Sequence, residues 1–462
     1  MFKKICALVL AIAMVLAMGS VAMAGETNTG DSGSTDSGTS KHNDVYTGSG
    51  KKEATTDVKN NEIPFVKSIV FFNANGSDVY KPNITFHYDV APDNNVDADG
   101  STATVTDDPS LHDNTSVVRN VYPGPAGGVT GTDITFASSD SAIKTSADGV
   151  EAEGVSALTV NFENTFTKPG IYRYKITESV KSPTGASDNA KLQAAGLTAR
   201  DSSYDNTRYL DVYIRYNASN ELELYGAVIF KTTTTPVGTD KITYDKTDKT
   251  TGFAPTGNNT DYKDDKNVDK YTTYDFSVKK TVSGSMADKN NQFPFYVSIT
   301  NSIANARYTY FAKNATTGTA ESITGGNIAK GSDNSGSDLK LKDGESIRFV
   351  GVPSNQATEL AVVIKEFNNT YDKYTPKATA TKGTINMTKG TAMEAQTGSD
   401  STTSFAVKTN DVLNQILTID NKLDEISPTG VVLRVAPYVL ILGAGLALLL
   451  ISRRRKTASE EE

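Results

Sequence analysis

The sequence predicts an all-β protein that contains two tandem β-sandwich domains. Short segments in which apolar and polar residues alternate recur along most of the chain, separated by polar turns, as is typical of sandwich strands. No long segment with a 3.6-residue apolar period interrupts them. A polar stretch from about 232 to 274, which holds two prolines and a charged run, separates the strands into two sets. We therefore expect a first sandwich at 61–270 and a second at 271–425.

Each expected strand rests on its own alternating segment, bounded by turn residues. Both sets are long enough to bury a core of ordinary domain size. The first set consists of Phe65–Phe72, Ile84–Val90, Ile171–Thr177, Tyr209–Tyr216 and Leu222–Phe230, and the second of Phe276–Val282, Phe293–Ile299, Ile347–Val352, Leu360–Ile364 and Gln415–Ile419.

The start of the chain predicts export. Two lysines, an apolar stretch from Ile5 to about Met18 and the Ala22-Met23-Ala24 triplet form the pattern of a cleaved signal peptide at 1–24. The Gly/Ser/Thr/Asp-rich segment 25–60 has almost no large apolar side chains, so we expect a flexible arm there. The one cysteine, Cys6, lies inside the signal peptide, so the exported chain has no disulfide to brace it.

Composition argues against several classes of function. The chain has a formal net charge of -8 and no tryptophan, which does not suit nucleic acid as a partner. It has three histidines and no Cys/His spacing of a metal site, so we expect neither metal nor cofactor. No Gly-rich phosphate loop or Gly-x-Ser-x-Gly motif is present, and we do not expect an enzyme.

The end of the chain has the order of a sorting signal. The motif ISPTG at 426–430 precedes a largely apolar run, Val435–Ile451, and a basic cluster at 453–456. This predicts a transmembrane sorting helix with a basic cytoplasmic tail within 431–462. A transpeptidase with a cysteine nucleophile could then attack the Thr429 carbonyl and release the chain from Gly430 onward.

This order resembles the cell-wall sorting signal of Gram-positive surface proteins, which a sortase reads. Pro428 stands directly before Thr429, which departs from the common Leu-Pro-x-Thr-Gly motif and is similar to the motif of pilus-building sortases. The resemblance implies an exported protein at the cell surface, anchored to the cell wall after a transient membrane stage. Sortase and peptidoglycan are its implied partners. An ordinary single-pass anchor with a chance Pro-Thr-Gly is the alternative.

Strand alternation directs three polar side chains into the core of the second sandwich. Lys280 shares a face with Phe276, Val278 and Val282, while Lys279 points the other way. By the same rule, Glu366 and Asn421 lie on apolar faces of their strands. Buried polar groups need partners, so we expect these three side chains to meet.

Such a meeting permits a condensation. Burial lowers the pKa of a lysine and raises that of a glutamate, which favours a neutral amine beside a protonated acid. Lys280 could then attack the Asn421 side-chain carbonyl while Glu366 polarises that carbonyl and shuttles protons, leaving an isopeptide bond and ammonia. In the alternative, Lys280 reaches the rim, Glu366 caps a turn and Asn421 is an ordinary linker amide.

The second domain also resembles the C-terminal domain of streptococcal-type major pilins over about residues 275–430. That family has immunoglobulin-like sandwiches with self-formed isopeptide bonds, which implies Lys280 and Asn421 as the crosslinked pair and Glu366 as the catalytic acid. The segments that carry the resemblance are VKKTVSG at 278–284, LKDGESI at 341–347 and TIDNK at 418–422.

The first domain carries a weaker likeness to the same family. The segment FTKPGIYRYKITE at 166–178 is similar to its N-terminal domain, and alternation directs Glu178 inward. Lys67 matches the family's first-strand lysine and also points inward. The implied crosslink needs a third residue, for which Asn267 lies nearest the expected place, with Asn258 and Asn259 as competitors.

Polymerisation requires an amine on one subunit that accepts the Thr429 acyl group of its neighbour. In pilins this lysine lies near the end of the first domain's last strand, and Lys241 occupies a comparable place. The resemblance therefore implies a pilus shaft subunit whose partners are neighbouring pilin subunits. The alternative is a monomeric wall-anchored adhesin on the same scaffold, which would bind a ligand on the host surface.

Overall fold

The structure, a computed structural model, confirms an all-β fold with curled sheets. The predicted signal peptide lies outside the residues that it describes, as do Asn258 and Asn259. The described residues are 44–46, 52–54, 61–96, 101–106, 116–163, 165–231, 241–243, 250–255, 262–333, 337–354, 360–367, 374–380, 402–408, 415–423 and 428–458.

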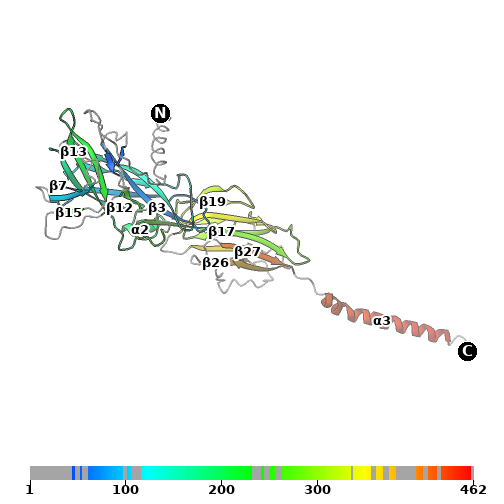
Figure 1. Cartoon of the computed structure of the whole chain (residues 1–462). Helices are drawn as coiled ribbons and strands as arrows, with labels where there is room; N and C mark the ends of the chain where they lie inside the picture. Colours follow the sequence, from blue (N-terminus) through cyan, green and yellow to red (C-terminus); the bar gives the residue numbers. More distant parts are fainter. Residues whose placement is uncertain are drawn as a thin grey trace, which may run out of the picture. The chain divides into compact units, whose positions relative to one another are not determined.

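All ten strands expected from alternation are present (Figure 1). They are β3 (Glu62–Phe72), β5 (Ile84–Pro92), β12 (Gly170–Ser182), β13 (Thr207–Tyr216), β14 (Leu222–Phe230), β17 (Asp269–Ser283), β18 (Phe293–Thr300), β23 (Ser346–Pro353), β24 (Ala361–Phe367) and β27 (Gln415–Lys422).

Further strands, mostly shorter, complete the sheets. Two of them, β1 and β2, fall in the stretch expected to be a flexible arm, where β1 pairs with β14 and β2 pairs with β1. The further strands are β1 (Asp44–Tyr46), β2 (Lys52–Ala54), β4 (Asp78–Val79), β6 (Ser101–Thr106), β7 (Ser116–Pro123), β8 (Val129–Gly131), β9 (Ile134–Phe136), β10 (Ile143–Lys144), β11 (Val150–Val160), β15 (Lys241–Thr243), β16 (Gly252–Phe253), β19 (Arg307–Phe311), β20 (Thr319–Ser322), β21 (Ile328–Lys330), β22 (Lys340–Leu341), β25 (Thr375–Ala380) and β26 (Thr402–Lys408).

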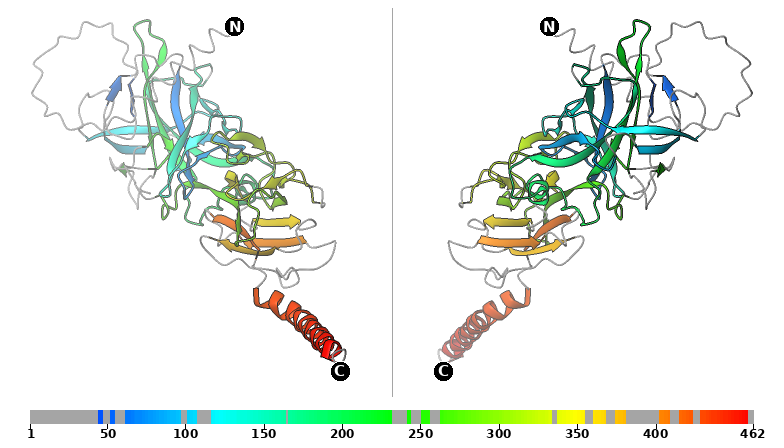
Figure 2. Two further views of the ribbon diagram at one scale, coloured as in Figure 1. Left: turned by 90° about the vertical axis from the view of Figure 1, so that its right-hand side faces the viewer. Right: turned by 90° about the vertical axis from the view of Figure 1, so that its left-hand side faces the viewer.

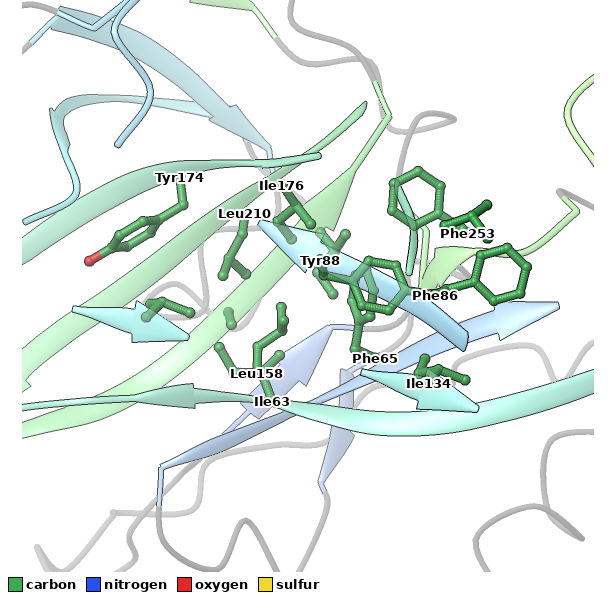
Figure 3. Close-up of a cluster of buried hydrophobic side chains, with 14 of the residues drawn as sticks. Ile63, Phe65, Phe86, Tyr88, Ile134, Leu158, Tyr174, Ile176, Leu210 and Phe253 are labelled. Carbon is green, nitrogen blue, oxygen red and sulfur yellow. The ribbon is translucent and has the colours of Figure 1, made fainter. Parts of the chain in front are cut away.

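The first sandwich encloses a core between two sheets. One sheet has the order β15-β6-β7-β12-β13-β14-β1-β2, with β5 paired to β12 and β9 paired to β5. In the other, β3 pairs with β11, and β11 pairs with β8. Figure 3 shows side chains from both sheets that face one another in this core. Its buried members include Ile63, Phe65, Tyr88, Leu158, Tyr174 and Leu210.

Part of the polar stretch expected to separate the domains belongs to the first sandwich. In β16, Phe253 is buried and its ring stacks on Tyr88 with centroids 5.8 Å apart. The first residues of β17 pair in parallel with β3, which aligns Asp269 with Ile69. The charged composition predicted a linker here, but one of its acids, Asp269, is buried and paired with positively charged side chains. The expected division between 270 and 271 falls inside β17.

The second sandwich pairs β17 with the last core strand. One sheet contains β20, β19, β23, β17, β27 and β25 in that order, and the facing sheet contains β21, β18, β24 and β26, with β22 paired to β18. Strands β17 and β27 run in parallel with Lys280 opposite Ile419. The buried core includes Phe276, Val278, Phe295, Ile347 and Ile364.

Among the residues that the structure describes, two helices interrupt this all-β pattern. Helix α2 (Asp188–Ala194), too short for the sequence pattern to predict, starts at Ser187, whose side chain accepts a hydrogen bond from the Ala190 N–H. Helix α3 (Pro428–Ala458) holds the apolar run and appears as one uninterrupted helix in Figure 2. Within the part of the chain that the structure describes, no helix combines the length and apolar character needed to cross a bilayer. The predicted membrane span is therefore not confirmed.

Candidate crosslinking sites

The second sandwich buries the three polar residues expected to meet. Lys280 lies on β17, Asn421 on the neighbouring β27, and Glu366 on β24 of the facing sheet. Their exposed fractions are 0% for Lys280, 2% for Glu366 and 1% for Asn421, whereas Lys279 is exposed. Alternation thus correctly predicted which side of each strand these residues occupy.

Glu366 contacts both other members of this trio. Its carboxylate oxygens lie 3.4 and 3.5 Å from the Lys280 Nζ, and its Oε1 accepts a hydrogen bond of 2.5 Å from the Asn421 Nδ2. Lys280 Nζ also donates to the Ile419 carbonyl at 3.3 Å. The Phe293 ring, with its centroid 4.4 Å from the Nζ, covers the amine with apolar surface.

Burial shifts both ionisable groups of the trio toward their neutral forms. Desolvation lowers the pKa of Lys280 to about 8, although the nearby Glu366 charge opposes the shift. Desolvation likewise raises the pKa of Glu366, against the opposing effect of Lys280. A neutral amine, the nucleophilic form of lysine, therefore becomes accessible near neutral pH.

The orientation of Asn421 places its nitrogen at the acid. Glu366 contacts Nδ2, the atom that would leave as ammonia, rather than the carbonyl oxygen that we expected it to polarise. Among the described residues, the Asn421 Oδ1 has no hydrogen-bond partner. This geometry suits Glu366 to deliver a proton to the leaving nitrogen.

The first sandwich also buries its expected lysine and glutamate. Lys67 on β3 is 1% exposed and Glu178 on β12 is 0% exposed, as alternation predicted. The Lys67 Nζ donates to the Glu178 Oε1 at 3.0 Å. The Phe86 ring lies against this amine, with its centroid 4.5 Å away.

The structure does not bring Asn267 to Lys67. Its side chain is exposed, and its Oδ1 accepts a hydrogen bond from the Asp205 N–H. Asp269, two residues further on, is buried in its place, with its Oδ2 2.6 Å from the Lys67 Nζ. The third member of this site is therefore a carboxyl group rather than an amide.

Two further residues complete the first site. Arg200 binds both oxygens of Asp269, through Nε to Oδ1 at 2.7 Å and through Nη2 to Oδ2 at 2.6 Å. The same Nη2 lies 2.5 Å from the Glu178 Oε1. Tyr204 donates its hydroxyl to Glu178 at 2.8 Å and accepts from the Lys67 Nζ at 3.1 Å. Two cations and two carboxylates thus share one buried cluster.

The cations decide the ionisation of Asp269. Burial alone would raise the pKa of this carboxyl, but the charges of Lys67 and Arg200 outweigh burial and hold it below its usual range. Asp269, in turn, raises the pKa of Arg200 against the opposing effect of burial. The first site therefore rests as ion pairs, whereas the second is shifted toward neutral groups.

Sequence reasoning missed Asp269, Arg200 and Tyr204. Alternation counted back from Lys280 would place Asp269 on the opposite face, because β17 changes phase where Asp275 and Phe276 are both buried and its register shifts. Arg200 and Tyr204 lie between α2 and β13, outside any strand, so no alternation could reveal them.

The residues expected to join subunits lie at the start of β15 and at the start of α3. Lys241 begins β15, which lies at the end of its sheet and pairs in parallel with β6. The structure does not describe the surroundings of the Lys241 side chain. Thr429 and Gly430 lie in the first turn of α3, and their side-chain surroundings are likewise not described.

Fold and sites define an all-β protein whose two sandwiches each bury a lysine against a glutamate. The chain is homologous to a pilin of Streptococcus pyogenes serotype M1, with 25% identity over 411 residues that cover 86% of this chain and 92% of the relative. The resemblance to streptococcal pilins that the sequence predicted is thereby confirmed.

Other comparisons cover parts or most of the chain. Residues 274–403 match a family described as a domain of unknown function, DUF7601. The crystal structure of the major pilin from S. pyogenes is 18% identical, covers 80% of this chain and 99% of its own, and has a TM-score of 0.38. The T3.2 major pilin of S. pyogenes is 17% identical, with 79% and 99% coverage and a TM-score of 0.36.

Proposed function

We propose that this chain is a structural subunit of a pilus on the cell surface. Its homology to a streptococcal pilin, which extends over 86% of the chain, carries this proposal. Neighbouring pilin subunits are the partners, and no substrate is turned over. The acidic composition and the two sets of strands along the chain suit an extracellular structural protein.

A sortase would join the subunits through Thr429. Its cysteine attacks the Thr429 carbonyl, Gly430 and the segment behind it leave, and a lysine amine of the next subunit takes the acyl group. Lys241, at the end of a sheet, is the proposed acceptor. The last subunit would transfer its acyl group to peptidoglycan, which anchors the pilus to the wall.

The second sandwich would carry a self-formed bond between Lys280 and Asn421. The neutral Lys280 amine attacks the Asn421 side-chain carbon, and the bond to Nδ2 breaks. Glu366 accepts a proton from the amine and gives one to Nδ2, which leaves as ammonia. Its contacts with both nitrogens support this role.

This bond would brace the domain against unfolding and tension. It closes a loop of about 140 residues, for which the chain-entropy estimate is roughly 5 kcal/mol of stabilisation. It also joins β17 directly to β27, so tension applied at the ends of the domain bypasses the strands between them. A pilus without disulfides gains a covalent brace in this way.

Wall extracts of cells that express the chain test the proposed function. A ladder of multimers that resists sodium dodecyl sulfate, lost in a Thr429→Ala variant and in a Lys241→Ala variant, is the expected result. A ladder that persists without Lys241 would exclude it as the acceptor. A single wall-linked band would instead favour the monomeric adhesin and overturn the pilus.

A further inference from the structure

An aromatic patch lies at the end of the first sandwich where β12 begins. The ring centroids of Phe162 and Phe166 are 5.5 Å apart, and those of Phe166 and Tyr172 are 5.0 Å apart. The Tyr172 ring in turn lies 6.0 Å from the Tyr122 ring. Phe166 and Tyr172 are each 6% exposed, whereas Phe162 and Tyr122 are half-buried. Core packing therefore fixes the two inner rings, and the two outer rings keep part of their surface accessible.

Lys168 adds an exposed cation to this aromatic patch. Its Nζ lies 4.1 Å from the centroid of the Tyr122 ring, and its side chain is exposed. The Tyr172 hydroxyl donates a hydrogen bond of 2.8 Å to the Lys168 carbonyl, which holds this loop against the rings. Among the described residues, no carboxylate forms an ion pair with Lys168, Glu163 on the same loop included. The charge of Lys168 is therefore available to an acidic group of another molecule.

The sheet register brings the aromatic patch close to Lys241, the proposed acceptor. Lys241 on β15 aligns with Thr102 on β6, and Thr102 aligns with Asn120 on β7. Tyr122 follows two residues after Asn120 on the same strand. Neighbouring strands lie about 4.8 Å apart, so the backbones of Lys241 and Tyr122 are roughly 12 Å apart. The proposed acceptor and the aromatic patch therefore belong to the same corner of the first sandwich.

We propose that the aromatic patch docks residues 424–429 of the neighbouring subunit, the segment that a sortase would join to Lys241. This inference rests on the proposed polymerisation through Thr429. The segment reads Asp-Glu-Ile-Ser-Pro-Thr, so it offers two acids to Lys168 and an isoleucine and a proline to the rings. An extended chain advances about 3.4 Å per residue, so the two acids lie about 14–17 Å before the joined threonine. That length spans the separation between Lys241 and the patch.

The charge of the chain gives this docking a direction. The formal net charge is -8, so two subunits repel one another over most of their surfaces. An exposed cation without an acidic partner marks a place where an acidic segment is attracted instead. Docking there holds the Thr429 acyl group beside the acceptor amine before the amide forms. The same contacts remain afterwards and support the covalent joint.

Binding of a synthetic peptide tests the docking without a sortase. The probe has the sequence of residues 423–429, an amidated end and a fluorophore at its start, and fluorescence anisotropy follows its binding to the purified chain. Saturable binding that weakens with added salt is expected. Lys168→Glu should weaken it about tenfold, because attraction to two acids becomes repulsion. Lys144→Glu is the matched control, because this exposed lysine lies on β10, which pairs with β4 rather than with strands of the patch. Absence of saturable binding to the parent chain, or equal affinity for the Lys168→Glu chain, would overturn the docking.

A charge exchange separates docking from a general effect of the variant. A peptide with Asp424→Lys and Glu425→Lys should bind the Lys168→Glu chain more tightly than it binds the parent chain. Equal affinity, or the opposite preference, contradicts the inference. On cells, Lys168→Glu should lower the yield of multimers several-fold, and an undiminished ladder would count against the docking while leaving the pilus intact. Absence of multimers from the parent chain would instead overturn the proposed function, and peptide binding would still decide the docking.

Discussion

The two sandwiches bury similar lysine and glutamate residues but surround them with different charges. In the second, Lys280 and Glu366 face an uncharged amide, and burial moves the pKa of each toward neutrality. In the first, Arg200 and Asp269 add a second pair of charges, and the pKa of Asp269 falls below its usual range. The comparison shows that the neighbours of a buried lysine decide the charge of its site. Beside the Asn421 amide, burial shifts Lys280 and Glu366 toward their neutral forms, whereas Lys67 and Arg200 hold the Asp269 carboxyl in its charged form.

The largest effect is expected from removing the second-domain lysine. Lys280→Ala would abolish the proposed Lys280–Asn421 bond, so the second sandwich should lose roughly 5 kcal/mol of unfolding free energy. Denaturant titration with hydrogen exchange of β18 peptides measures this loss. Lys279→Ala is the control, because this neighbour on the same strand is exposed. Equal behaviour of the two variants would remove the proposed brace.

Removing Arg200 tests the charge balance of the first site. Arg200→Gln leaves buried acid without its cation, and such losses cost about 3–5 kcal/mol. This loss of stability is measured by the same denaturant titration, with hydrogen exchange of β12 peptides. Arg215→Gln breaks a more exposed pair with Glu223 and should cost less than about 1 kcal/mol. A small effect at Arg200 would show that the cluster tolerates unbalanced charge.

The pH dependence distinguishes a free Lys280 from a bonded one. In an Asn421→Ala variant the amine stays titratable, with a pKa of about 8 in the folded chain against 10.5 when unfolded. Between these values the unfolded chain binds a proton that the folded chain lacks, so stability should rise with pH, by up to about 3 kcal/mol. If the proposed bond consumes Lys280 in the parent protein, the parent should lack this rise. If the stability of the variant and of the parent protein rises equally with pH above 8, the parent lysine is also free.

A smaller effect is expected at Tyr204. Tyr204→Phe removes the hydroxyl that donates to Glu178 and accepts from Lys67, which should cost about 1–2 kcal/mol in the exchange of first-domain strands. Tyr216→Phe offers a control, since that side chain is 48% exposed. If Tyr204→Phe leaves the unfolding free energy unchanged, the Tyr204 hydroxyl does not stabilise the cluster.

Strand alternation predicted most of the fold and much of both sites. It gave ten strands and the burial of Lys67, Glu178, Lys280, Glu366 and Asn421, because side chains on a strand must alternate between its two faces. The prediction from alternation and composition failed where a charged residue is buried. Asp269 lay in a charged run that reads as linker, yet Lys67 and Arg200 neutralise it inside the core. Arg200 lies outside any strand, so only the three-dimensional fold brings it to the site.

The mass of the peptides around Lys280 tests the central claim most directly. If burial makes this amine attack Asn421, the two peptides will be joined and about 17 Da lighter than their sum, the mass of ammonia. Glu366→Ala should restore separate peptides at full mass. Unjoined peptides in the parent protein would contradict the claim, whatever the proximity of the three side chains.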